Sequence, residues 1–211
     1  MDFLRYTLVS DGSSDRQLMP ILDWLLRTTG AVRSVNSEWA DLSSIEKPKG
    51  LPMRLKRALD LYPCDVLFVH RDAEKQEAAL RLEEIRNALS EIHSATLPPA
   101  VCVVPVRMQE AWLLFDEKAI RHAAGNPNGT EALNLPKLTA VESIPDPKAV
   151  LHEMLRKACG LSGRRLKKFS ASRATSFVTH YATDFSKLHA IPAFQRLESD
   201  IIELRDKGWR P

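Results

Sequence analysis

A short, wholly apolar stretch that ends in charged residues places the strongest constraint on this chain's fold. The stretch is Val66–Val69, and two carboxylates, Asp72 and Glu74, follow it closely. A run of this kind is typical of a strand that is buried on both faces of a parallel sheet. We therefore expect a central buried strand over Cys64–Val69, with both acids at its carboxyl end.

The rest of the chain alternates between strand and helix patterns. Further strands are predicted over Phe3–Ser10, Ala31–Val35 and Ala100–Val106. Helices are predicted over Ser14–Arg27 (capped by Ser14 or Asp15), Pro52–Leu61, Lys75–His93, Met108–Phe115, Pro147–Ala158, Ala171–Tyr181 and Pro192–Lys207. This order predicts a Rossmann-like, mostly parallel sheet with helices on both faces. We expect an α/β core over residues 1–116 and a mainly helical extension, packed on it, over residues 117–211.

Composition excludes several classes of protein. The chain has 211 residues, of which 44% are hydrophobic, and a net charge of +3, as in an ordinary globular protein. No apolar run approaches the roughly 20 residues that a membrane-spanning helix needs, and the first residues lack a secretory signal pattern. The three cysteines form no CxxC pair. We therefore expect a cytoplasmic protein without a structural zinc site or a membrane partner.

Charge is unevenly distributed along the chain. From Lys148 to the end there are 13 Lys and Arg residues against 6 Asp and Glu residues. An acidic N-terminal part and a basic C-terminal part would suit a metal site joined to a segment that binds a polyanion. The same residues are equally typical of a solvated helical surface.

Asp72 and Glu74 are the first candidates for a metal site. Residues i and i+2 of a strand point the same way, so both carboxylates could face one ion. Mg²⁺ prefers one or two carboxylates together with water and phosphate oxygens. The alternative is a helix N-terminus, with Asp72 as the cap and Glu74 in the first turn.

A second acidic turn follows the first predicted strand. It reads Asp11-Gly12-Ser13-Ser14-Asp15, in which Gly12 permits a sharp turn and the close approach of a phosphate. Asp11 could ligate a metal ion or act as a general base. The alternative is again a turn followed by a helix cap.

Other candidates come after the last predicted strand and from the basic tail. Glu110 could complete the acidic site, and Arg107 or Arg71 could hold a phosphate. Glu110 could also be a surface residue beside a core tryptophan. The basic segment suits contact with a phosphate backbone, or is a solvated helix face, and contains Arg164, Arg165, Lys167 and Lys168.

These motifs resemble a known family. An acid-Gly-x-x-Asp turn after the first strand, with Asp-x-acid after a later one, looks like the TOPRIM fold of topoisomerases, primases and overcoming-lysogenization-type nucleases. The phrase from Arg107 to Leu114 (RMQEAWLL) resembles the Glu-x-Trp-Leu element of the TOPRIM-like family filed as domain of unknown function 4276. The Asp146-Pro147-Lys148 element and the helical tail resemble that family too. Asp11 stands where the family has Glu, and Glu74 where it has Asp.

The resemblance implies a metal-dependent nuclease that acts on nucleic-acid phosphodiesters. Asp11, Asp72 and Glu74 would bind Mg²⁺, for which Mn²⁺ can substitute, and Glu110 would assist as a fourth catalytic residue. Such proteins resemble the effector half of anti-phage defence systems, which implies a partner ATPase. Arg71, Arg107 and the basic segment would contact nucleic acid.

The alternative function is a non-catalytic module that binds nucleic acid or a protein. In that reading the acids are helix caps and the basic tail docks the partner. A phosphatase or phosphotransferase that acts on a small molecule is a weaker reading, because no motif defines a small-ligand pocket. The sequence leaves open whether DNA or RNA is bound and whether the chain forms a homo-oligomer.

Overall fold

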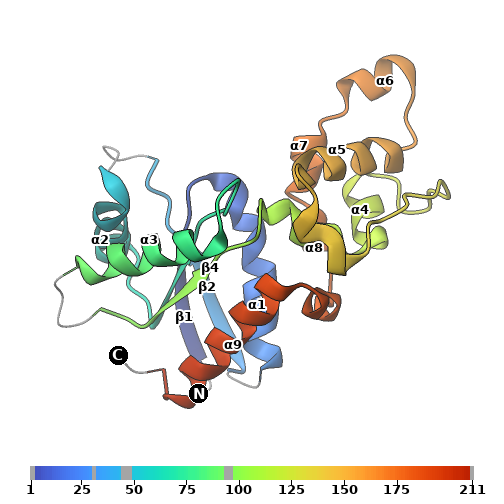
Figure 1. Cartoon of the computed structure of the whole chain (residues 1–211). Coiled ribbons are helices and arrows are strands. Elements are labelled where there is room, and N and C mark those ends of the chain that lie inside the picture. Colours follow the sequence, from blue (N-terminus) through green and yellow to red (C-terminus); the bar gives the residue numbers. More distant parts are fainter. Residues whose placement is uncertain (1–2, 30–31, 44–48, 93–96, 210–211) are drawn as a thin grey trace.

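The core of the protein is a four-stranded sheet in which every neighbouring pair of strands is parallel (Figure 1). The computed structural model describes residues 3–29, 32–43, 49–92 and 97–209. The strand order is β2-β1-β3-β4. The strands are β1 (Phe3–Val9), β2 (Ser34–Trp39), β3 (Val66–His70) and β4 (Ala100–Val103). The Rossmann-like α/β architecture predicted from the sequence is therefore confirmed at this level.

Helices cover both faces of the sheet (Figure 1). α2 (Gly50–Leu61) and α3 (Ala78–Ser90) share one hydrophobic cluster with one face. α1 (Met19–Thr28) and α9 (Pro192–Asp206) share the other cluster with the opposite face. Parallel strands require such crossovers, because the chain must return to the same end of the sheet before each new strand.

β3 is buried at all five of its residues. Val66 and Phe68 belong to the cluster with α1, whereas Leu67 and Val69 belong to the cluster with α2 and α3. This division follows from the alternation of side chains along a strand. Phe68 also meets the ring of Tyr6 edge to face, with 5.0 Å between the ring centroids. The continuous apolar run of this strand therefore serves two layers at once.

Short helices form the region between β4 and α9. They are η2 (Gln109–Leu113), α4 (Glu117–Ala123), η3 (Leu138–Ser143), α5 (Pro147–Ala158), α6 (Gly163–Lys168), α7 (Ala171–Thr175), α8 (Val178–Tyr181) and η4 (Ser186–Ala190). Their apolar residues continue the cluster of α1 and α9, and fully buried Trp112 packs against Phe194 of α9. α6 lies farthest from the sheet (Figure 1). The chain thus leaves the sheet after β4 and returns to it in α9.

All four strand predictions differ from the structure at an end: β1 ends at Val9 and not at Ser10, and β3 runs over Val66–His70 and not over Cys64–Val69. The strand predicted over Ala31–Val35 is observed at Ser34–Trp39, and Ala31 lies outside the described residues. This edge strand has no buried residue, so its pairing with β1 and not an apolar pattern decides where it lies. The strand predicted over Ala100–Val106 ends at Val103.

The predicted helices also shift at their ends. α3 begins at Ala78 and not at Lys75, and His93, where it was predicted to end, lies outside the described residues. The single helix predicted over Ala171–Tyr181 is divided into α7 and α8. The Thr175 hydroxyl donates to the Ala171 carbonyl at 3.0 Å near this break, and such bonds compete with regular helix hydrogen bonding. Within the described part of the chain, no helix is long and apolar enough to cross a membrane.

Candidate functional site

The candidate site lies where the chain changes direction across the sheet. β1 leads to β2 on one side of it, and the chain then returns to place β3 on the other side. In open parallel sheets, ligands bind outside the carboxyl ends of the strands at such a switch point. Here the segments that follow β1, β3 and β4 meet at that edge.

The segments after β3 and β4 run side by side beyond the ends of the strands. The Ala73 amide donates to the Pro105 carbonyl at 3.1 Å, and the Glu74 amide donates to the Arg107 carbonyl at 2.8 Å. Glu74 and Arg107 both have positive φ, 53° and 67°. Backbone strain of this kind concentrates at functional sites, where the surroundings must enforce it.

Asp72 and Glu74 have different surroundings, although the charge of Glu74 still contributes to raising the pKa of Asp72. β3 ends at His70, so both acids follow its carboxyl end as predicted, but they are not strand residues, and the argument that strand alternation turns them to one face is wrong. Glu74 is 64% exposed at its side chain and faces Arg81 at 3.6 Å. The capping alternative for Asp72 is also wrong, because the N-cap of α3 is Glu77.

Asp72 is the most perturbed acid of the site. Its Oδ1 accepts a hydrogen bond from the Gln109 amide at 2.9 Å. Burial, followed by the nearby carboxylates of Glu110 and Asp15, raises the pKa of Asp72 from 3.8 to about 7, against the opposing effect of the hydrogen bond from Gln109. A carboxyl group that titrates near neutral pH in a cleft is a marker of a functional site.

Asp15 lies beside Asp72 and is buried. Its Oδ1 accepts from the Gln109 side-chain amide at 2.6 Å, and its Oδ2 accepts from the Gly12 amide at 3.0 Å. Gln109 therefore joins the two acids, binding one through its backbone and the other through its side chain. The sequence predicted that Ser14 or Asp15 caps this helix. Instead, Gly12 holds the cap position, and Asp15 is the third residue of η1.

His70 lies beneath both carboxylates. Its Nδ1 lies 3.0 Å from the Val103 carbonyl, which can only accept, so Nδ1 carries the hydrogen. Its Nε2 then faces Asp72 Oδ1 at 3.6 Å and Asp15 Oδ2 at 4.0 Å. Burial lowers the pKa of His70, which favours the neutral ring with a lone pair on Nε2.

Glu110 adds a third carboxylate, which is buried as Asp15 is. Only 5% of its side chain is exposed, and its Oε1 lies 3.6 Å from Nζ of Lys148. The alternative of a surface glutamate is therefore wrong, although Glu110 does lie next to the core residue Trp112. The charge of Glu110 is close enough to raise the pKa of Asp72.

Asp11 faces a different set of partners. Its two oxygens pair with Arg54 Nη1 at 2.7 Å and with Arg71 Nε at 2.8 Å. Gly12 has a φ of −147°, an extended backbone that any residue adopts, so the turn does not require glycine. The structure thus brings Asp15 to Asp72 and directs Asp11 to two arginines.

The predicted basic residues lie in three places. Arg71 bridges Asp11 and Glu84, and Arg107 Nη1 donates to the Glu74 carbonyl at 3.4 Å. The basic segment forms α6, which has no buried residue. Its four cationic side chains are exposed, as predicted for either a nucleic-acid contact or a solvated face, and they are Arg164, Arg165, Lys167 and Lys168.

The donor atoms suit Mg²⁺ in their chemistry, although they do not form a complete set of ligands. Among the described residues, no group of three or more Asp, Glu, His or Cys side chains is arranged to hold a metal ion. Mg²⁺ needs only one or two carboxylates when water and phosphate supply the other oxygens. Asp72 fits that need, because burial and the neighbouring carboxylates raise its pKa and no described residue donates a hydrogen bond to its Oδ2.

Sequence reasoning missed the roles of Asp15, His70 and Gln109. The role of Asp15 could have been predicted from the sequence, since Asp15 is the second acid of the Asp-Gly-x-x-Asp turn. The role of His70 could have been predicted as well, because it is the polar last residue of an otherwise apolar strand. The role of Gln109 could not, since its two hydrogen bonds join residues 37 and 94 positions away.

A comparison of the chain with protein-family models, with curated proteins and with solved structures finds no match in any of the three. The class of the protein therefore rests on its own fold and site. It is an α/β protein with an all-parallel, four-stranded sheet and a group of carboxylates at the carboxyl edge of that sheet.

Proposed function

We propose that this protein is a TOPRIM-like, Mg²⁺-dependent nuclease that cleaves nucleic-acid phosphodiesters. The observation that carries the proposal is Asp72, whose pKa is raised to about 7 by burial and by the carboxylates of Glu110 and Asp15. Carboxylates gathered at the switch point of a parallel sheet repel one another, and a divalent cation relieves that repulsion.

In this proposal Asp72, Asp15 and Glu110 hold the ion, and Mn²⁺ can replace Mg²⁺. When bound, the ion supplies Lewis-acid chemistry, polarising a phosphate oxygen and lowering the pKa of a water. Gln109 keeps Asp72 and Asp15 side by side through its two hydrogen bonds. The lone pair on Nε2 of His70 faces the same carboxylates and can take up a proton there. Glu74 is proposed at the exposed rim of the site, near Arg107.

The nucleic acid is proposed to extend from this edge towards α6. α6 lies at the end of the molecule farthest from the sheet (Figure 1), and its four cationic side chains are exposed, whereas its Leu166 packs against the core. Such a helix binds the phosphate backbone without reading sequence. Because the motifs of this chain resemble those of TOPRIM-like defence effectors, we also propose a partner ATPase in a defence system.

The test combines metal binding with cleavage, and it compares Asp72→Ala with Asp65→Ala. Asp65 lies just before β3, at the opposite end of that strand, and pairs with Arg5 at 3.0 Å. We expect the wild type and Asp65→Ala to bind Mn²⁺ in a calorimetric titration and to cleave at least one of single- or double-stranded DNA or RNA. Asp72→Ala should do neither, while keeping the circular dichroism of the folded protein. Undiminished cleavage by Asp72→Ala would refute the assignment of the site.

The second candidate is a module that binds nucleic acid without cleaving it. It is favoured by the absence of a complete metal-ligand set among the described residues, together with the exposed cations of α6. In that case substitution of the four α6 cations by alanine should abolish binding. Asp72→Ala should then leave it intact.

A further inference from the structure

A pocket beside the buried carboxylates is lined by arginines that the proposed chemistry does not use. It has a volume of about 840 Å³ and opens at the carboxyl ends of β1 and β2. Its cationic lining residues are Arg16, Arg54 and Arg71, and Trp39 and Asp11 also line it. The volume falls within the range of pockets that hold small molecules.

Two of the arginines are held on either side of one carboxylate. Arg54 lies 2.7 Å from one oxygen of Asp11 and also donates to the Ser10 carbonyl. Arg71 lies 2.8 Å from the other oxygen of Asp11 and also pairs, at 2.8 Å, with Glu84, which lines the pocket too. Both guanidinium groups are mostly buried, with 24% and 19% of their side chains exposed. They are therefore positioned before any ligand arrives.

Asp11 itself is held less firmly than its partners. Its side chain is 49% exposed. It also stands apart from the hydrogen bonds through which Gln109 holds Asp15 and Asp72. A half-exposed carboxylate gains little from an ion pair. Two guanidinium groups that face one small anion match a phosphate, which offers more oxygens and more charge than a carboxylate. Asp11 thus occupies the position of an exchangeable anion.

The far side of the pocket suits the remainder of a nucleotide. The guanidinium of Arg16 lies over the ring of Trp39, 5.5 Å from its centroid. Trp39 is itself oriented by a hydrogen bond from its indole nitrogen to the Ser10 hydroxyl at 2.9 Å. No described residue accepts a hydrogen bond from the Arg16 guanidinium. Arg16 is consequently free to contact a sugar or a base while it stacks on the ring.

We propose that this pocket binds the terminal phosphate of a nucleotide between Arg54 and Arg71, with the Asp11 carboxylate displaced, and holds the nucleoside against Arg16 and Trp39. The charges of Asp11 and Arg71 both act on His70, whose ring faces Asp15 and Asp72, so the pocket adjoins the carboxylates of the proposed metal site. The identification of the ligand as a phosphorylated end of the substrate rests on the proposed nuclease function. The phosphate pocket itself does not require a metal ion.

The experiment measures binding of thymidine monophosphate, inorganic phosphate and thymidine by calorimetry in the presence of EDTA. We expect the wild type to bind the monophosphate and not thymidine. Arg54→Ala should weaken binding roughly tenfold, because a charge-assisted hydrogen-bond partner is lost. Asp11→Asn should strengthen it roughly threefold, because the competing charge is removed. Arg16→Ala should weaken binding of the monophosphate but not of phosphate.

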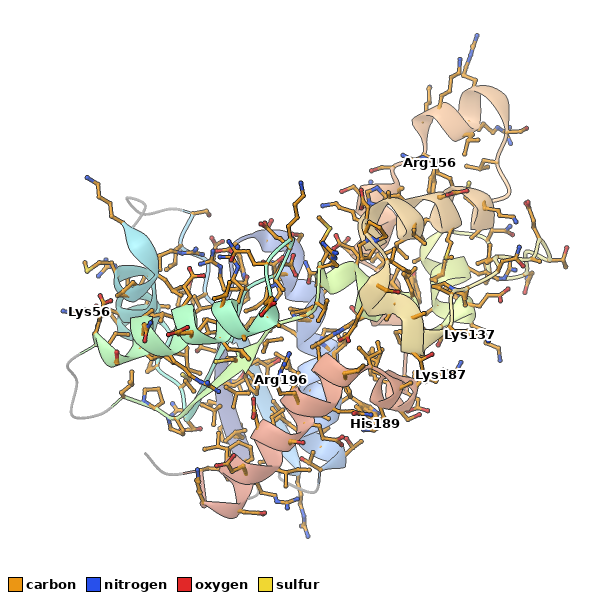
Figure 2. The ribbon with its side chains drawn as sticks, in the orientation of Figure 1. Lys56, Lys137, Arg156, Lys187, His189 and Arg196 are labelled. Carbon is orange, nitrogen blue, oxygen red and sulfur yellow. The ribbon has the colours of Figure 1, made fainter. Side chains whose placement is uncertain are left out.

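Lys56→Ala is the matched control. Lys56 is a cation on the same helix as Arg54, points outward from α2 (Figure 2), and does not line this pocket. Its substitution should leave the affinity unchanged. Unaltered affinity in Arg54→Ala, or equal affinity in Asp11→Asn and the wild type, would overturn the proposal, as would an absence of binding to the folded wild type.

Cleavage assays separate this proposal from the nuclease proposal. Metal-free binding that follows the expected pattern, without cleavage under any condition, would establish the pocket and reject the nuclease. Cleavage of 5′- and 3′-phosphorylated oligonucleotides that is unaffected by Arg54→Ala would reject the pocket as a substrate subsite.

Discussion

Replacement of Asp72 by Asn should stabilise the metal-free protein, although it should destroy the proposed activity. The pKa of Asp72 is raised by burial to about 7, whereas the carboxyl of an unfolded chain has a pKa of roughly 3.9. At about 1.4 kcal/mol for each unit, the ionised side chain costs the folded state about 4 kcal/mol. Because 28% of the side chain remains exposed, we expect Asp72→Asn to raise the free energy of unfolding by about 2–4 kcal/mol.

The destabilisation caused by ionised Asp72 must grow as the pH rises. The folded protein keeps the Asp72 proton to a higher pH than the unfolded chain does, because the folded pKa is the higher one. The cost is therefore nearly absent at pH 4, grows as the pH rises towards 7, and is complete above that value. Asn keeps the oxygen that accepts from the Gln109 amide but carries no charge.

The assay is urea unfolding in EDTA at pH 8 and pH 4.5, for the wild type and for Asp72→Asn. At pH 8 the variant should be the more stable protein by about 2–4 kcal/mol, and at pH 4.5 the two should agree to about 1 kcal/mol. Asp65→Asn is the control, and it should change the free energy of unfolding at pH 8 in the opposite direction. The hydrogen bond from Arg5 lowers the pKa of Asp65, so its ionised form stabilises the folded protein. Equal or lower stability of Asp72→Asn at pH 8 would refute the argument.

Three further outcomes are expected. At pH 8, addition of Mg²⁺ should raise the melting temperature of the wild type and leave that of Asp72→Asn unchanged; an equal rise in both would place the ion elsewhere. Phe68→Ala should lower the free energy of unfolding by about 3–5 kcal/mol in urea titrations, because Phe68 is fully buried against Tyr6, and a loss below about 1 kcal/mol would contradict that packing. Substitution of the four α6 cations by alanine should reduce the slope of log affinity for DNA against log salt by up to about 4, measured by fluorescence anisotropy; an unchanged slope would remove α6 from the interface.

The parts of the fold that could be predicted are those with a strong local pattern. β3 was predicted because a continuous apolar run can only be satisfied by burial on both faces. α2 and α9 were predicted within two residues of their observed ends, because their apolar residues recur at helical spacing. β2 was predicted several residues away from its observed position. A polar edge strand is defined by its pairing with a neighbouring strand and carries little apolar pattern of its own.

The candidate site was predicted in its location but not in its membership. Acids after β1 and β3 had to meet at one edge once the strands were parallel, and they do. Which acid of the first turn meets Asp72 was not predictable, because Asp11 and Asp15 are both charged and only four positions apart. The Gln109 side chain turns Asp15 inward, and Arg54 and Arg71 draw Asp11 outward.

The sequence by itself therefore determined the buried central strand, the parallel α/β arrangement and the edge at which polar side chains collect. These properties follow from burial and from strand and helix periodicity, which act over a few neighbouring residues. Only the tertiary structure decided that Asp15, His70 and Gln109 surround Asp72, and that an arginine-lined pocket lies beside them. The reason is that a side chain's direction and charge environment depend on residues tens of positions away, whose contacts leave no local pattern.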